Sequence, residues 1–228
     1  MSPRKPVQQR SRDRIEQILL GAADLLAKTG DTDDLTTTSV SKRSGVPVAT
    51  IYRYFADRMA IITTLIDRET IELDDAVAES LDQLDTVTPA ILLETLVVAH
   101  LRHFQASRRS IVLWFGARQS SRVLARVDRR YKYIGAWVYD GSVKSGLVVD
   151  DAPAFGGELL IWMGDRVFEF MFREERSSEE QEAILREYID TMTSQIGKYL
   201  TPLGKRGIPM AEFIAQVGEY KPIVVEDH

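Results

Sequence analysis

The stretch that decides the fold is LTTTSVSKRSGVPVATIYRYFADRM, residues 35–59, which reads as two short helices joined by a tight turn. Thr36 and Thr37 are good N-cap residues, because a threonine hydroxyl accepts hydrogen bonds from the free amides at a helix start. Gly45 tolerates the left-handed backbone with which helices end, and Pro47 has a preset φ that suits the next helix. The pattern therefore predicts a helix-turn-helix.

The outward face of the second helix carries the functional signal. Over two turns from Val48, Ile51 and Phe55 share the inner face at i, i+4 spacing. Val48 and Ala49 can then touch thymine methyls in a major groove, and Arg53 can bond guanine or a phosphate. Hydroxyl and cationic side chains of the kind that bind phosphates surround them: Thr37, Thr50, Tyr52, Tyr54 and Arg58. A helical hairpin in an all-α core explains the periodicity as well.

The order of these residues closely resembles the DNA-binding signature of the TetR family of one-component repressors, over roughly residues 11–65. In that pattern an apolar residue and a threonine open the first helix, Gly-Val makes the turn, and Thr-x-Tyr-x-Tyr-Phe ends the recognition helix before a basic residue. The matching residues are Leu35, Thr36, Gly45, Val46, Thr50, Tyr52, Tyr54, Phe55 and Arg58. Pro47 departs from the usual polar cap, and Val48 with Ala49 makes the reading face more apolar than in many members.

The resemblance implies an all-α protein with two domains. We expect a helix-turn-helix DNA-binding domain at 1–56, whose residues 1–10 form a flexible basic tail. A larger helical ligand-binding and dimerisation domain should follow at 57–200, and a C-terminal tail at 201–228. The DNA-binding residues that the motif implies are Thr36, Thr37, Pro47, Val48, Ala49, Thr50, Tyr52, Arg53, Tyr54 and Arg58.

Composition restricts the classes of protein that remain. The 228 residues suggest one or two domains, and a hydrophobic content of 44% is enough for a sizeable core. The absence of cysteine excludes a disulfide framework, a thiolate nucleophile and a cysteine-ligated metal. The first residues, MSPRKPVQQRSR, lack the apolar core of a signal peptide, and no run approaches the roughly 18–20 apolar residues of a membrane span. We therefore expect a cytoplasmic protein.

The charge is divided unevenly along the chain. The net charge is −5, yet residues 1–60 hold ten Lys and Arg against seven Asp and Glu, and the remainder holds 19 against 27. A mildly basic head on an acidic body fits a protein that presents one end to DNA. The basic tail residues either reach toward phosphates or a minor groove, or only solubilise the chain; they are Arg4, Lys5, Arg10 and Arg12.

Helical periodicity continues through the rest of the chain. We expect further helices over about residues 11–28, 57–84, 89–105, 121–145, 152–173 and 178–200, with Asp57 as a cap. A short helix should open at Pro209 and end at Gly218. The acidic run of the long helix is expected to form its solvated face, with Asp67, Glu69, Glu72, Asp74, Asp75 and Glu79.

Aromatic residues in the middle of the chain predict a ligand cavity. They concentrate in RRSIVLWFGARQSSRVLAR, residues 108–126, and in the helices on either side. We expect a mostly apolar cavity with His103 or Arg118 as its polar anchor, which favours an apolar or aromatic effector. Its residues would be His103, Phe104, Trp114, Arg118, Tyr131, Ile134, Trp137 and Val138. Ordinary core packing is the alternative for these aromatics. His100 and His103 lack a third metal ligand nearby, so we expect no metal site.

The helix at 152–173 is apolar on several faces and therefore needs burial on two sides. One side can be its own domain and the other a second subunit. The resemblance places the dimer interface on this helix and the next. The interface residues that we expect are Leu159, Met163, Val167, Phe168 and Met171.

The sequence thus predicts a homodimeric transcriptional repressor that binds a palindromic operator in double-stranded DNA. Its operator binding would be relieved by a small apolar or aromatic effector, and no cofactor is expected. A transcriptional activator and a ligand-independent DNA-binding protein are the alternatives. A helical enzyme is the remaining class, but the chain lacks cysteine, a Gly-rich phosphate loop, an HExxH motif and a defensible pair of carboxylates.

Overall fold

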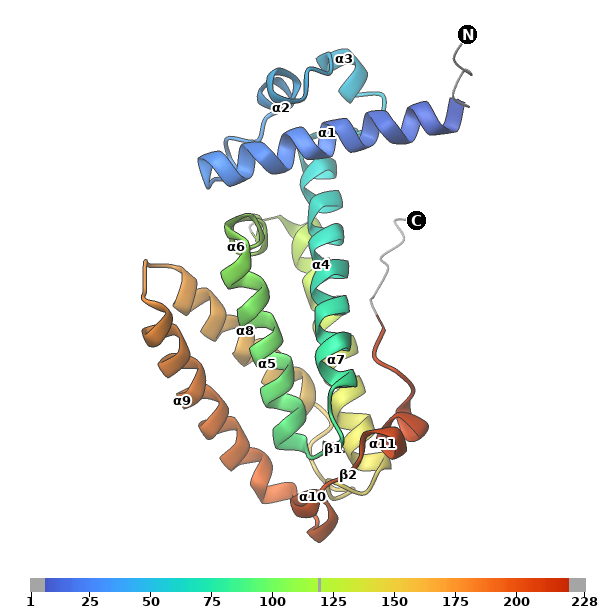
Figure 1. Cartoon of the computed structure of the whole chain (residues 1–228), viewed down its shortest axis with the longest axis vertical. Helices are drawn as coiled ribbons and strands as arrows, with labels where there is room; N and C mark the ends of the chain where they lie inside the picture. Colours follow the sequence, from blue (N-terminus) through green and yellow to red (C-terminus); the bar gives the residue numbers. More distant parts are fainter. Residues whose placement is uncertain (1–6, 119, 222–228) are drawn as a thin grey trace. The chain divides into compact units, whose positions relative to one another are not determined.

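A computed structural model describes residues 7–118 and 120–221 of the chain, except the side chain of Val7. About 76% of these residues are helical (Figure 1), which confirms the predicted all-α class. The elements in chain order are α1 (Val7–Thr29), α2 (Thr37–Ser44), α3 (Val48–Ile51), α4 (Arg58–Asp82), β1 (Thr86–Val87), α5 (Pro89–Ala106), α6 (Arg108–Gly116), α7 (Ser121–Lys144), α8 (Gly156–Phe172), α9 (Ser178–Ile196), a 3-10 turn (Gly197–Tyr199), α10 (Pro202–Arg206), β2 (Ile208–Pro209) and α11 (Met210–Val217).

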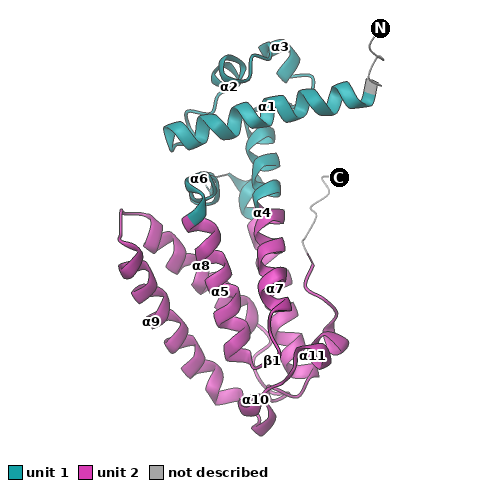
Figure 2. Cartoon of the chain, viewed as in Figure 1, with its two compact units in different colours: residues 1–69, 106–124 teal, residues 70–105, 125–228 magenta. Residues whose placement is uncertain are grey.

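The chain forms two compact units (Figure 2). Unit 1 comprises residues 1–69 and 106–124, and unit 2 comprises residues 70–105 and 125–228. Residues 1–56, for which we expect a DNA-binding domain, fall within unit 1, which also takes in the start of α4 and the whole of α6. Helices α4 and α7 each continue from one unit into the other.

Helix α1 supports the helix-turn-helix of unit 1. Its buried stripe packs with apolar residues of the following segment; the buried set includes Ile18, Leu19, Ala22, Leu26, Leu35, Val40, Val46 and Ile51. A Cβ at Gly21 would lie 2.6 Å from the Cβ of Ser44, so the missing side chain lets α1 and α2 approach closely. The helix begins at Val7 rather than Ser11, so residues 7–10 of the predicted tail are helical. Residues 1–6, with Arg4 and Lys5, lie outside the described residues.

Helix α6 is joined to the rest of unit 1 through buried polar contacts. The Glu69 carboxylate accepts from Arg109 Nε at 2.6 Å and from the Ser110 hydroxyl. The Thr32 hydroxyl, from the loop after α1, donates to the Gly116 carbonyl. Glu69 is only 4% exposed, so its predicted place on the solvated face of α4 was wrong. The reason is that Arg109 and Ser110, about 40 positions away, supply partners that helical periodicity alone does not reveal.

Unit 2 is a helical body whose core is closed by the C-terminal segment. The predicted short helix is confirmed as α11, and its Met210 and Phe213 are buried in the core. Trp137 lies between the C-terminal aromatics, with Phe213 and Tyr220 each 5.4 Å from its ring centroid. The two-residue antiparallel pair of β1 and β2 also fastens this segment, and the sequence pattern did not predict it.

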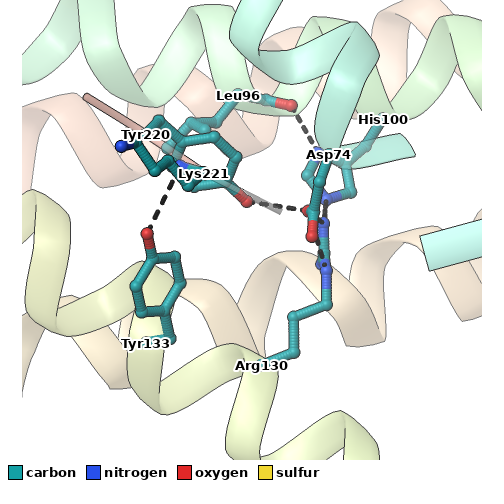
Figure 3. Close-up of polar contacts among 7 residues, drawn as sticks. All are labelled: Asp74, Leu96, His100, Arg130, Tyr133, Tyr220 and Lys221. Atoms are coloured by element: carbon teal, nitrogen blue, oxygen red, sulfur yellow. Dashed lines mark hydrogen bonds and ion pairs between the residues drawn. The ribbon is translucent and has the colours of Figure 1, made fainter. Parts of the chain in front are cut away.

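A buried polar cluster joins α4, α5, α7 and the C-terminal segment (Figure 3). Arg130 Nη2 lies 2.6 Å from Asp74 Oδ1, and the Tyr220 hydroxyl donates to the same oxygen at 2.8 Å. His100 Nε2 faces the Arg130 guanidinium, while His100 Nδ1 lies 2.6 Å from the Leu96 carbonyl oxygen. Asp74 is fully buried, so its predicted place on the solvated face was also wrong. Inside unit 2, Arg130 compensates its charge and Tyr220 donates a hydrogen bond to it.

Candidate nucleic-acid interface and candidate ligand cavity

Helix α2, the first helix of the helix-turn-helix, is capped at both ends by the residues that flank it. The Ser39 amide donates to the Thr36 hydroxyl at 3.1 Å, and the Thr36 amide donates to the Ser39 hydroxyl at 2.9 Å. This reciprocal pair makes Thr36 the N-cap and leaves Thr37 as the first helical residue. Gly45 ends α2 with a φ of 71°, the left-handed conformation predicted for it.

The second helix is shorter than the two turns that we predicted. Pro47, with a φ of −55°, precedes α3, which ends at Ile51. The backbone then turns tightly, and the amides of Tyr54 and Phe55 both donate to the Ile51 carbonyl at 2.9 Å. Ile51 and Phe55 are buried, as predicted from their spacing. The residues between them are thereby held facing outward.

The outward surface around α3 combines apolar, hydroxyl and cationic groups. Ala49, Tyr52 and Arg53 are exposed on it. Pro47 is also exposed, while the half-buried members of the predicted set on and beside α3 are Val48, Thr50 and Tyr54. The hydroxyl oxygens of Tyr52 and Thr37 lie 3.3 Å apart, which links α3 to the start of α2. All ten residues expected to contact DNA lie on α2, α3 or the adjoining turns and helix ends of unit 1.

The two basic residues of this surface, Arg58 and Arg53, differ in the ion pairs and hydrogen bonds that their side chains make within the chain. Arg58 Nη2 lies 3.2 Å from Asp33 Oδ1, and both side chains remain largely exposed. Arg53 makes no ion pair or side-chain hydrogen bond with any residue that the structure describes. A phosphate or a base edge is therefore a new partner for Arg53, whereas Arg58 would exchange one partner for another.

Asp57 fixes the start of α4 beside this surface. Its carboxylate accepts from the Ala60 amide at 2.8 Å, as predicted for a cap, and pairs with Arg122 at 3.0 Å. The Ala60 hydrogen bond, with the Arg122 contacts, keeps the pKa of Asp57 below its usual value. Asp57 therefore ties the first turn of α7 to the first turn of α4 within unit 1.

Unit 2 contains a cavity of about 500 Å³ that four helices and the segment before α8 line. Helix α5 contributes Pro89, Leu93 and Leu96, and α7 contributes Val138, Tyr139 and Ser142. Helices α8 and α9 form the other walls, with residues such as Gly156, Leu160, Ile161, Met192 and Ile196. None of the described lining residues is charged.

Of the eight residues predicted to line a ligand site, only Val138 lines this cavity. Ile134 and Trp137 belong to the core of unit 2, where Trp137 Nε1 donates to the Gly218 carbonyl. The Tyr131 hydroxyl donates to buried Asp165. Trp114 and Arg118 lie in unit 1, where Arg118 Nε donates to the Trp114 carbonyl at 2.9 Å.

Phe104 and His103 are not among the described residues that line the cavity. Phe104 is buried, with the Phe168 ring 5.6 Å and the Phe172 ring 5.8 Å from it. His103 packs edge-on against Phe104. Sequence reasoning missed the cavity walls on α5, α8 and α9, although it noted that α8 is apolar on several faces. A helix of that kind can wall a cavity as well as pack in a core.

Helix α8 carries an exposed apolar stripe, and three of its members, Phe155, Leu159 and Met163, also line the cavity. Its members are Phe155, just before the helix, with Leu159, Met163 and Phe170, and they are exposed by 67%, 50%, 39% and 52%. Of the predicted interface residues, Leu159 and Met163 lie on this stripe and Val167 is half-buried. The last two, Phe168 and Met171, are buried within the chain itself.

Among the described residues, no group of three or more His, Asp or Glu is placed to hold a metal ion. None of the described helices has the length and apolar content that crossing a membrane requires.

Neither a protein-family model nor a curated protein matches the sequence. Solved structures with the same fold include a TetR-family regulator from Streptomyces coelicolor, 23% identical, with a TM-score of 0.61 over 82% of this chain and 99% of that one. A TetR-family regulator from Pectobacterium atrosepticum is 12% identical, with a TM-score of 0.65 over 86% and 98%. The regulator FadR from Bacillus subtilis, in complex with stearoyl-CoA, is 17% identical, with a TM-score of 0.64 over 79% and 98%.

Proposed function

We infer that this chain, which has the fold of TetR-family transcriptional regulators, is a DNA-binding repressor that a small molecule releases from its operator. The observation that carries the inference is the outward surface around α3, where Arg53 and Tyr52 are exposed beside apolar Ala49 on a capped scaffold. We assign no enzymatic activity, because the neighbours with this fold are transcriptional regulators.

On DNA, α3 would lie in the major groove. Val48 and Ala49 would contact base edges, and Arg53 would bond a guanine or a phosphate. Thr36, Thr37, Thr50 and the two tyrosines would hold the phosphates, with Arg58 exchanging Asp33 for one of them. The four-residue helix α3 offers little contact area, so tight binding needs a second DNA-binding head, that is, a second copy of this helix-turn-helix. Two such heads related by a two-fold axis require a palindrome with half-sites about 34–36 Å apart.

The second head would come from a second copy of the chain, joined through α8 and α9. The exposed stripe of Phe155, Leu159, Met163 and Phe170 supports this arrangement, because contiguous apolar surface on a monomer marks an interaction site. A two-fold interface places the same stripe of both chains in contact. Phe168 and Met171, being buried already, would support the stripe from beneath rather than cross the interface.

The cavity of unit 2 would hold the effector, for which we propose an apolar or aromatic small molecule. The ligand of the Bacillus subtilis regulator, stearoyl-CoA, supports small-molecule control in a protein of this fold. A ligand weakens operator binding only if it prefers a conformation that binds DNA less well. A tenfold loss of operator affinity needs about 1.4 kcal/mol of coupling. Helices α4 and α7, which continue through both units, are the route that we propose for that coupling.

Selection from random-sequence duplexes tests the DNA-binding function and supplies an operator. We expect the whole chain to enrich a palindrome whose half-sites are separated by one helical turn or a multiple of it. Arg53→Ala should weaken binding and relax the sequence choice, by about 1–3 kcal/mol if the side chain reads a base. Arg206→Ala removes another exposed arginine, from α10, and is the matched control, with no change expected. Failure to enrich any sequence would refute the function.

A further inference from the structure

The described walls of the cavity in unit 2 are uncharged and mainly apolar. Its volume of about 500 Å³ lies in the range of small-molecule sites. The described lining residues include no Asp, Glu, Lys, Arg or His. Aliphatic side chains dominate, among them Leu93, Leu96, Val138, Ile161 and Met192. Such walls stabilise a ligand mainly by removing its apolar surface from water.

Of the five polar side chains that line this cavity, which are Tyr139, Ser142, Thr191, Gln195 and Tyr199, only Ser142 has a buried oxygen without a hydrogen-bond partner among the described residues. The Tyr139 hydroxyl already donates to the Ala152 carbonyl at 2.6 Å. Ser142, one helical turn later on α7, is 3% exposed, and its Oγ has no hydrogen-bond partner among the described residues. A buried hydroxyl in this state loses the hydrogen bonds that water would give it. Rotation about its single side-chain bond can turn the Ser142 hydroxyl toward a polar group in the cavity.

The same walls discriminate against charge. A carboxylate or phosphate moved from water into apolar surroundings is strongly destabilised unless a cation or several donors meet it. No described lining residue supplies a cation. A hydroxyl, ether or carbonyl group needs only one partner, and Ser142 can act as either donor or acceptor.

We propose that this cavity binds an uncharged, mainly aliphatic molecule whose single hydrogen-bonding group pairs with Ser142, and that it rejects carboxylates and phosphates. The proposal rests on the effector role proposed for unit 2 and narrows the ligand class of that site. The head group of the ligand lies inside the cavity beside α7, and its chain lies against α5, α8 and α9.

Titration calorimetry with decanol and decanoate tests the class directly, because the two share a chain and differ in the charge of the head group. At neutral pH we expect decanol to bind the whole chain and decanoate to bind at least tenfold more weakly. Equal binding would mean that the head group stays in water at the mouth, which overturns the proposal. Binding of neither ligand overturns it as well.

Two serines of the same region give a matched pair of variants. The Oγ atoms of Ser142 and Ser145 are both buried without a partner among the described residues, but only Ser142 lines the cavity. Ser142→Ala should weaken decanol binding about tenfold, the effect of losing one hydrogen bond to a buried group. Ser145→Ala should leave it unchanged. Equal affinities in the two variants would contradict the role of Ser142.

A second pair tests the position of the cavity without removing a polar group. A Cβ at Gly156 or at Gly197 meets no atom within 4 Å, so both glycines accept a side chain without a clash at Cβ. Only Gly156 lines the cavity. Gly156→Leu should abolish decanol binding, and Gly197→Leu should not. Full decanol binding by Gly156→Leu would overturn the assignment.

These titrations contain no DNA, so their failure leaves the DNA-binding function standing. Repeating the operator titration with decanol present separates the two proposals. Weaker operator binding with decanol supports both. Decanol binding without any change in operator affinity supports the ligand class and overturns only the effector role.

Discussion

The exposed ion pairs near α3 in unit 1 and the buried ion pair of unit 2 differ in what their charges can do. In unit 1 the pair Arg58–Asp33 has side chains 42% and 82% exposed, and the pair Arg122–Asp57 is exposed to a similar degree. In unit 2 the side chains of Arg130 and Asp74 are 4% and 0% exposed. An exposed pair contributes about 0–1 kcal/mol, and removing one partner of a buried pair costs about 3–5 kcal/mol.

This difference in exposure indicates which charged side chains can exchange one partner for another. Arg58 can leave Asp33 for a DNA phosphate at little cost, because water and salt already weaken the pair. Arg130 cannot leave Asp74 without stranding a buried carboxylate. The exposed ion pair Arg58–Asp33 of unit 1 is therefore suited to exchanging its partners. The buried cluster of unit 2 fixes α4, α5, α7 and the C-terminal segment in one arrangement.

The largest expected effect comes from breaking the buried pair. Arg130→Met should lower the free energy of unfolding by about 3–5 kcal/mol, because Asp74 stays buried without its cation. Urea denaturation of native protein and variant measures this difference. Arg58→Met is the control and should stay within about 1 kcal/mol of the native protein. The double variant Asp74→Leu with Arg130→Met should recover part of the loss. A single Arg130 variant as stable as the native protein would mean that the cluster is not what fixes unit 2.

A smaller effect is expected from acid. Arg130 can only donate, so His100 Nε2 accepts and the ring proton on Nδ1 goes to the Leu96 carbonyl. Burial, and next the Arg130 charge, lowers the pKa of His100 from 6.5 to about 3. The unfolded chain therefore binds more protons than the folded chain between these values, and stability falls as pH drops below about 6.5.

The change from this one group approaches about 1.4 kcal/mol per pH unit. His100→Gln keeps an acceptor for Arg130 and removes the titration. Between about pH 6.5 and 5, we expect the variant to lose less stability than the native protein. Parallel stability curves for the two proteins would show that His100 titrates normally in the folded chain.

The smallest expected effect concerns the exposed pair. Asp33→Ala should change the free energy of unfolding by less than about 1 kcal/mol. It should also strengthen operator binding, because it frees Arg58 and removes a negative charge near the phosphates. Titrations at two salt concentrations measure both the affinity and its salt dependence. Weaker operator binding by this variant would show that Asp33 positions Arg58 for DNA.

The helix-turn-helix was predictable because its determinants are local. The capping hydroxyl of Thr36, the positive φ of Gly45 and the inward pair Ile51 and Phe55 act within a few positions of themselves. Even there the length of α3 was overestimated, since the tight turn to Phe55 leaves no distinctive residue pattern.

The ligand cavity was not predictable in the same way. An aromatic residue reads alike in sequence whether it lines a cavity or fills a core. Trp137 lies in the core of unit 2, where the Gly218 carbonyl, 81 positions later, accepts its hydrogen bond and the Phe213 ring packs against its own. Asp74 read as a surface carboxylate for the same reason, since its partners Arg130 and Tyr220 lie 56 and 146 positions away.

The most direct test of the central claim is an operator titration with a variant that carries Arg53→Ala, Tyr54→Ala and Arg58→Ala. Fluorescence anisotropy with the selected duplex measures its affinity, and thermal melting checks that it folds. We predict native melting and a loss of operator affinity of about a hundredfold or more, since three contacts of roughly 1 kcal/mol or more are removed. Operator binding of native strength by a folded triple variant would contradict the claim that the surface around α3 binds DNA.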